Sequence, residues 1–193
     1  MRFTVLTPEL DYYGGENPAT SKLFVDGKQV SRKVRPYWYR ECSDYQNEGN
    51  NLHPLYVAIK DIHEQNKNRL LLQEPIKRKD GELLRANSTL GYLDGNSYWD
   101  WFLVEFDEGE EGCNANAKPL DELLPELCER LGFVTFGETE MIVRRSNKHG
   151  FAAYPDHYAL HIYLRLETPQ TPAQLRNMLI GWADIFDWVG DGI

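Results

Sequence analysis

The clearest alternation of apolar and polar positions lies in the second half of the chain. Within residues 100–107 apolar side chains recur with a period of two, which predicts a strand. Residues 119–132 carry leucines at helical spacing and predict a helix that Gly132 ends. Pro119 is expected at the first helical position, and Pro125 predicts a kink or a broken turn within this helix.

Two more strands and a helix are predicted further along. Residues 138–146 predict a short strand, and residues 158–167 predict a longer one. Thr171 followed by Pro172, with Gln174 three residues after the threonine, is the signature of a capping box and predicts a helix start. The buried stripe of this helix is expected to be Leu175, Met178, Leu179 and Trp182.

The first half of the chain has a weaker pattern. Residues 23–25 and 29–30 flank Asp26-Gly27 and predict a hairpin. Residues 54–65 have apolar positions at roughly helical spacing. Asn, Gly and Tyr are frequent between these segments, which favours loops over a core rather than a second compact domain.

The order from residue 99 onward is therefore β-α-β-β-α. It predicts an α+β fold with a ferredoxin-like, RRM-like core in residues 99–193. A last strand would complete that arrangement, so the core is expected to be truncated before it. Residues 1–98 are expected to be an N-terminal α/β elaboration packed on the core. The fold alone does not define a function, because binding modules and enzymes share it.

Composition excludes several classes of protein. Of 193 residues, 41% are hydrophobic, which argues against wholesale disorder. Three cysteines lie far apart, so a disulfide framework is not expected, and a cytoplasmic location follows as the simplest interpretation. The sequence has no run of about 18 apolar residues and no signal-peptide pattern at its beginning, so no membrane partner is expected.

The formal net charge of −9 does not by itself exclude nucleic acid, because a phosphate-binding surface is local. Basic residues gather in 28–40, 77–85 and 144–149, and each run has the alternative interpretation of a solvated face. The first run contains the aromatic residues of 37–39. These side chains would either stack on single-stranded DNA or pack in the core.

Glu105 and Asp107 are the first candidate for chemistry. Two carboxylates separated by one residue on a strand share a face, and their charged ends would lie about 5–7 Å apart. At an effective dielectric of about 20 this repulsion costs roughly 2–3 kcal/mol, which a bound cation would offset. Hard divalent ions such as Mg²⁺ or Mn²⁺ take oxygen ligands of this kind. The alternative is that both acids face water.

Two further candidates follow along the chain. Residues 144–150 join cationic side chains, a serine and a glycine in one turn, which suits a triphosphate, although a solvated turn has the same composition. His161 lies in an apolar strand, where it would either bind a phosphate oxygen or be a core histidine. His157 would share its face but lies about 13 Å away, too far to share one metal.

The order of these stretches resembles the archaeo-eukaryotic primase superfamily, in particular the replication proteins of phages and plasmids. The resemblance covers residues 99–190 and depends on FLVEFD (102–107), VRRSNKHGFAAYPDHYALHIYL (143–164) and LRLETPQTPAQLRNML (164–179). Glu105 stands where the family has Asp. The family's third carboxylate has three candidates in this chain, Asp184, Asp187 and Asp191.

The resemblance implies a metal-dependent DNA primase/polymerase domain that extends a primer on single-stranded DNA. The catalytic residues would be Glu105, Asp107 and His161, and the two carboxylates would hold Mg²⁺ or Mn²⁺. The nucleoside triphosphate would be bound by Arg144, Arg145, Ser146 and Lys148. In this family such domains are often joined to a helicase domain or protein.

Two other functions stay open. One is a non-catalytic ferredoxin-like module of a replication initiator that binds nucleic acid through stacked aromatic side chains. The other is a replication-initiator nuclease that uses His157, His161 and a tyrosine. The nuclease predicts a covalent 5′-phosphotyrosyl adduct. If the domain is instead catalytic as a polymerase, replacing Glu105 and Asp107 with alanine should abolish Mn²⁺-dependent nucleotide incorporation and leave DNA binding nearly intact.

Overall fold

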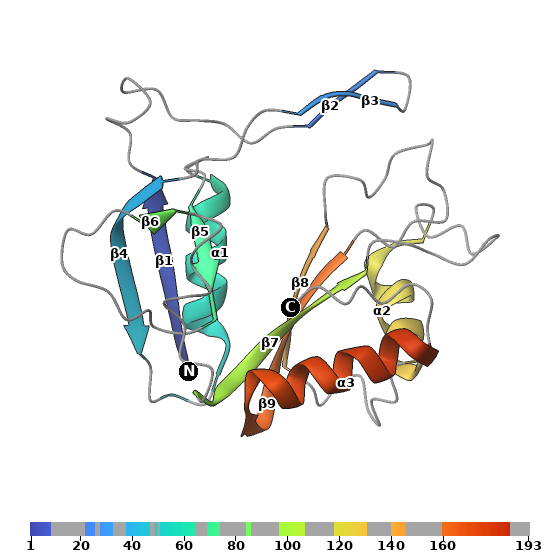
Figure 1. Ribbon diagram of the computed structural model, residues 1–193. Helices are drawn as coiled ribbons and strands as arrows, with labels where there is room; N and C mark the ends of the chain where they lie inside the picture. The colour runs from blue at the N-terminus through green and yellow to red at the C-terminus, as the bar shows by residue number, and fades with distance from the viewer. Residues whose placement is uncertain are drawn as a thin grey trace. The chain divides into compact units, whose positions relative to one another are not determined.

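The computed structural model combines helices and strands, in agreement with the predicted α+β class (Figure 1). The chain divides into two compact units, Met1–Asp100 and Trp101–Ile193. The structure describes residues 1–8, 22–25, 28–32, 38–46, 49, 51–64, 69–73, 84–85, 97–106, 118–130, 140–145 and 160–185.

The N-terminal unit contains a four-stranded sheet in the order β5-β1-β4-β6. Its strands are β1 (Arg2–Pro8), β4 (Trp38–Gln46), β5 (Leu70–Leu72) and β6 (Leu84–Arg85). β4, β5 and β6 each join the sheet through an antiparallel pairing. The interpretation of this half as loops rather than a compact domain is therefore wrong for the described residues.

β1 explains why the sequence pattern missed this sheet. Phe3, Val5 and Leu6 are buried, and Thr4 between them is also fully buried, so no alternation marks the strand. The Thr4 hydroxyl donates a hydrogen bond to a carboxylate oxygen of Asp44 on β4 at 2.5 Å, which satisfies the buried polar group. A strand that is buried on both faces loses the period-two signal.

The hairpin and the first helix were predicted correctly. β2 (Lys22–Val25) and β3 (Lys28–Arg32) pair in antiparallel fashion. α1 (His53–Glu64) buries Leu55 and Ile59 on one side and leaves Tyr56 and Val57 exposed on the other.

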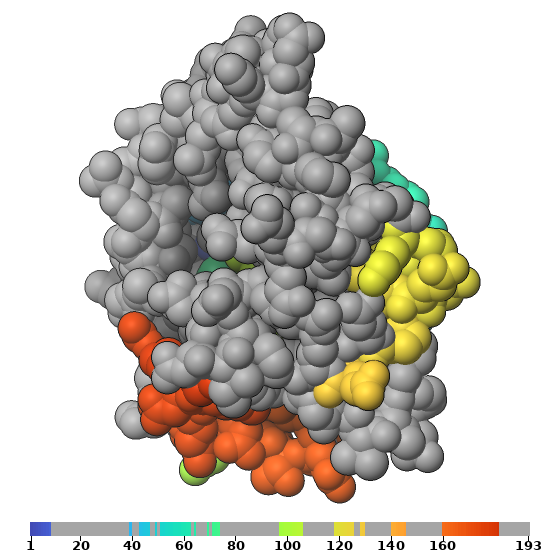
Figure 2. Space-filling model, turned by 90° about the vertical axis from the view of Figure 1, so that its right-hand side faces the viewer, coloured from blue at the N-terminus to red at the C-terminus, as the bar shows by residue number. Residues whose placement is uncertain are grey.

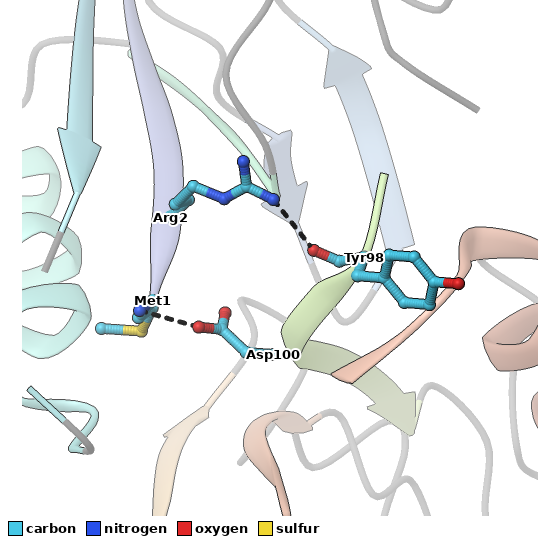
Figure 3. Close-up of polar contacts among 4 residues, drawn as sticks. All are labelled: Met1, Arg2, Tyr98 and Asp100. Carbon is cyan, nitrogen blue, oxygen red and sulfur yellow. Dashed lines mark hydrogen bonds and ion pairs between the residues drawn. The ribbon is translucent and has the colours of Figure 1, made fainter. Parts of the chain in front are cut away.

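Two polar contacts join residues 1–2 to residues 98 and 100, at the beginning of β7 (Trp99–Phe106). The N-terminal ammonium of Met1 lies 2.7 Å from a carboxylate oxygen of Asp100. The Arg2 guanidinium donates to the backbone carbonyl of Tyr98 at 3.3 Å (Figure 3). Both contacts lie within the N-terminal unit and fix the backbone directly before Trp101.

The C-terminal unit contains the predicted β-α-β-β-α order. Its elements are β7 (Trp99–Phe106), α2 (Leu120–Arg130), β8 (Met141–Arg145), β9 (Leu160–Gln170) and α3 (Pro172–Ile185). The first residues of β7 still belong to the N-terminal unit. β9 lies between β7 and β8 in a three-stranded sheet, and β8 pairs antiparallel to it.

On one face of this sheet the residues of two strands are apolar and buried. These are alternate residues of β7 and β9, namely Phe102, Val104, Leu160, Ile162 and Leu164. The two helices contribute the fully buried Leu123 of α2 and Leu175 of α3. α2 (yellow) and the stretch from β9 into α3 (orange to red) also form part of the surface drawn in Figure 2.

The helix ends follow local rules. The Gln174 side-chain oxygen accepts from the backbone N–H of Thr171 at 2.8 Å, and the Thr171 hydroxyl oxygen accepts from the N–H of Gln174 at 3.3 Å, so the predicted capping box is present. α2 begins one residue after Pro119, whose carbonyl accepts from the N–H of Leu123. The helix continues through Pro125, so no broken turn occurs there.

Candidate functional site on the second sheet face

Glu105 and His161 meet on the other face of the three-stranded sheet. The imidazole Nε2 of His161, on β9, lies 3.6 Å from a carboxylate oxygen of Glu105, near the end of β7. This is an ion-pair separation when the imidazole is protonated, and it is too long for a hydrogen bond. The side chains are 26% and 43% exposed, respectively, so a ligand can reach both.

Arg144 extends this group onto β8. The register of β8 and β9 places Arg144 directly opposite His161, and Ile142 opposite Tyr163. Directly opposite residues of paired strands share a face, so Arg144, His161 and Tyr163 lie together. Arg144 is the diagonal neighbour of Tyr163 across the two strands. Burial raises the pKa of Tyr163 against the opposing effect of Arg144, so this hydroxyl is neutral at physiological pH.

Trp101 closes the buried end of the same face. Its ring lies 6.1 Å from that of Tyr163, at an interplanar angle of 35°. Trp101 is only 1% exposed and Tyr163 only 5%, so burial decreases along this face toward Glu105 and His161. A well-packed aromatic pair therefore borders an open polar group.

Two contacts between β7 and β9 give the direction of β7 relative to β9. Trp101 meets Tyr163, and Glu105, further along β7, meets His161, which comes earlier on β9. β7 and β9 therefore run in opposite directions, as β8 and β9 do. It follows that β7 and β8 are parallel to each other and that β9 is inserted between them.

The charges form an ordered row across the sheet. A carboxylate on β7, an imidazole in the middle on β9 and a guanidinium on β8 lie side by side. The guanidinium end favours an anion with several oxygens, such as a phosphate, and the carboxylate end favours a hard cation. A ligand that carries phosphate and a divalent ion together would suit both ends.

The predicted site residues are only partly brought together. Arg145 lies opposite Leu160 in the register and is next to Arg144 in the strand, so it belongs to the opposite face of the sheet. The structure thus separates the two arginines that were expected to bind one triphosphate. Asp107, Ser146 and Lys148 lie outside the described residues.

Within the described part of the chain, Glu105 is the predicted ligand on which a metal site would depend. No group of three or more His, Cys, Asp or Glu side chains among the described residues is arranged to hold a metal. Glu105 nevertheless presents an accessible carboxylate, which is the donor that Mg²⁺ or Mn²⁺ prefers. Asp107, the expected second ligand, and the candidates Asp187 and Asp191 lie outside the described residues, and the Asp184 side chain is likewise not described.

The remaining sequence predictions have mixed outcomes. Tyr39 of the aromatic segment 37–39 is 4% exposed, which indicates core packing for this residue. His157 and most of the basic run 77–85 lie outside the described residues. None of the helices that the structure describes has the length and apolar character needed to span a membrane.

Sequence reasoning missed Tyr163 and Trp101 as parts of the site. Tyr163 is two residues after His161 on the same strand, so the period-two rule places both on one face. The strand rule therefore indicated Tyr163, but its position next to Arg144 on this face depends on the register of β8, which the sequence does not specify.

Comparisons of the chain with protein-family models, with curated proteins and with solved structures gave no match.

Proposed function

We propose that this chain is a metal-dependent nucleotidyltransferase domain, a primase/DNA polymerase that extends a primer on a single-stranded DNA template. The observation that carries the proposal is the 3.6 Å approach of Glu105 and His161 on an accessible sheet face. Arg144, directly opposite His161, supplies a cation for phosphate. Glu105 would face the metal ion that accompanies a bound nucleoside triphosphate, and His161 and Arg144 would face its phosphates.

The proposal includes a ferredoxin-like core. A split β-α-β unit has two parallel strands with an antiparallel strand inserted between them. The order β7-β9-β8, with β9 antiparallel to its neighbours, supports this arrangement.

Each residue has a defined role in the proposed reaction. Glu105, together with Asp107, would hold Mg²⁺ or Mn²⁺, which when bound offsets charge at the transferring phosphoryl group. His161 donates a hydrogen bond to a phosphate oxygen, and Arg144 neutralises phosphate charge. Ser146 and Lys148 are proposed to add contacts to the triphosphate.

A primer-extension assay tests the proposal. The full chain is incubated with a primed single-stranded template, nucleotides and Mn²⁺, and Glu105→Gln is compared with Glu129→Gln on the exposed side of α2. Loss of a metal ligand removes several kcal/mol of transition-state stabilisation, so we expect incorporation to fall at least about 100-fold in Glu105→Gln. Glu129→Gln should retain the wild-type rate.

The same assay distinguishes the binding-module alternative. Trp101 and Tyr163 are buried and offer no free ring face for base stacking, which weighs against a stacking platform at this position. A wild-type protein that binds single-stranded DNA but incorporates no nucleotide with Mn²⁺ or Mg²⁺ would favour that alternative and contradict the proposed activity.

A further inference from the structure

β8 forms one edge of the three-stranded sheet (Figure 1). Within the described part of the chain its neighbour is β9, and the two strands pair in an unbroken register from Met141 to Arg145. A strand with one neighbour presents a row of backbone N–H and C=O groups to which another strand can pair. Such edges are commonly protected by charges, by proline or by a bulge, and Met141, Ile142 and Val143 offer none of these.

The side chains of this edge have an ordered pattern of charge. Met141, Ile142 and Val143 are apolar and half-buried. Glu140, directly before the strand, is exposed. Because side chains alternate along a strand, Glu140, Ile142 and Arg144 share one face, which is the face of His161. An acid and a base therefore flank one apolar residue on the face of the candidate site.

This pattern is complementary to itself in an antiparallel pair. A two-fold axis perpendicular to the sheet keeps each residue on the same face in both copies, and directly opposite residues also share a face. The numbers of two opposite residues must therefore both be even or both be odd. Near the middle of the strand this condition leaves two registers, one with the axis at Ile142 and one with the axis at Val143.

The charges distinguish the two registers. With the axis at Ile142, Glu140 lies opposite Arg144 of the partner subunit, and symmetry repeats this pair on the other side of the axis. With the axis at Val143, Arg144 lies opposite Ile142 of the partner subunit, so the arginine has no opposite charge across from it. Opposite charges directly across paired strands stabilise the pairing, which favours the register with the axis at Ile142.

We propose that two copies of this chain associate through their β8 edges, with Glu140 of each copy opposite Arg144 of the partner subunit. The two three-stranded sheets then form one continuous sheet, and the partner's Glu140 lies beside Arg144 on the face of the candidate site. The inference does not depend on the proposed function. One pair of short strands is smaller than a standard interface, so we expect a weak dimer with a dissociation constant on the order of 100 µM.

Sedimentation equilibrium of the full chain, from about 5 µM to about 500 µM, measures the dimer. Glu140→Arg and Arg144→Glu each place like charges opposite one another at both symmetric positions. Either change should weaken dimerisation at least about tenfold. Glu129→Arg makes the same charge change as Glu140→Arg at an exposed position of α2, so it is the matched control and should dimerise as the wild type does.

An equimolar mixture of Glu140→Arg and Arg144→Glu tests the register. In the mixed pair, the arginine at position 140 of one variant lies opposite the glutamate at position 144 of the other, and the remaining two positions keep the original pair. The mixture should therefore dimerise about as strongly as the wild type, although neither variant does so alone. Far-UV circular dichroism of each variant, compared with the wild type, shows whether it is folded.

Three results would overturn the inference. They are a wild-type chain that stays monomeric up to about 500 µM, single variants that dimerise as tightly as the wild type, and a mixture of folded variants that stays monomeric. A monomeric chain that extends primers would contradict this dimer and leave the proposed function intact. A dimer of the predicted register without primer extension would support the interface and contradict the polymerase.

Discussion

Replacing Leu175 with alanine tests whether α3 supports the sheet that carries the site. Leu175 is fully buried, so the truncation to alanine removes its three outer carbon atoms from the core. At about 0.8 kcal/mol per buried methylene the lost transfer free energy is about 2.4 kcal/mol. The cavity left behind brings the expected loss of unfolding free energy to about 2–5 kcal/mol.

Ile180→Ala is the matched control on the same helix. Ile180 is 41% exposed, so its truncation removes little buried area, and alanine has the higher helix propensity. We expect this change to alter the unfolding free energy by less than about 1 kcal/mol.

The two variants are compared by urea denaturation, followed by far-UV circular dichroism and tryptophan fluorescence. The midpoint should fall in Leu175→Ala while the slope with urea stays close to the wild-type value. The reasoning would be refuted if Leu175→Ala were no more costly than Ile180→Ala, because α3 would then not be packed as described.

Three further changes have defined outcomes. Thr171→Ala removes a cap of α3 and should lower the unfolding free energy by about 1 kcal/mol, as measured by thermal unfolding. Thr4→Val removes a buried hydroxyl that is hydrogen-bonded and should cost about 1 kcal/mol in urea titration. Burial raises the pKa of the Cys128 thiol in the folded protein. The neutral thiol therefore contributes to stability at pH values below the pKa of the unfolded chain's thiol, and this contribution is lost as the pH rises through the pKa of the folded state. In a Cys42→Ser/Cys113→Ser variant, iodoacetamide at about pH 8.5 should therefore modify Cys128 only as fast as the protein opens.

The C-terminal unit was largely predictable because its elements obey simple periodicities. β7 and β9 alternate, and α3 begins at a capping box that the sequence displays. The first four-stranded sheet was not predictable, since β1 is buried at consecutive positions and β5 and β6 are very short. Their pairing is set by contacts between residues far apart in the sequence.

The sequence predicted only how site residues of the same strand are placed relative to one another. The period-two rule places His161 and Tyr163 on one face, and it separates Arg144 from Arg145. The contact of Glu105 with His161 depends on the order of the strands in the sheet. This order is not determined by the succession of helices and strands along the chain. The placement of Arg144 opposite His161 depends in addition on a register that only the folded sheet defines.

A crystal structure with Mn²⁺ and a non-hydrolysable nucleoside triphosphate tests the central claim most directly. The account predicts an anomalous peak about 2.2 Å from a Glu105 carboxylate oxygen, with phosphate oxygens in contact with Arg144 and His161. Density for the metal and the triphosphate on the opposite face of the three-stranded sheet, or at neither of these residues, would contradict it.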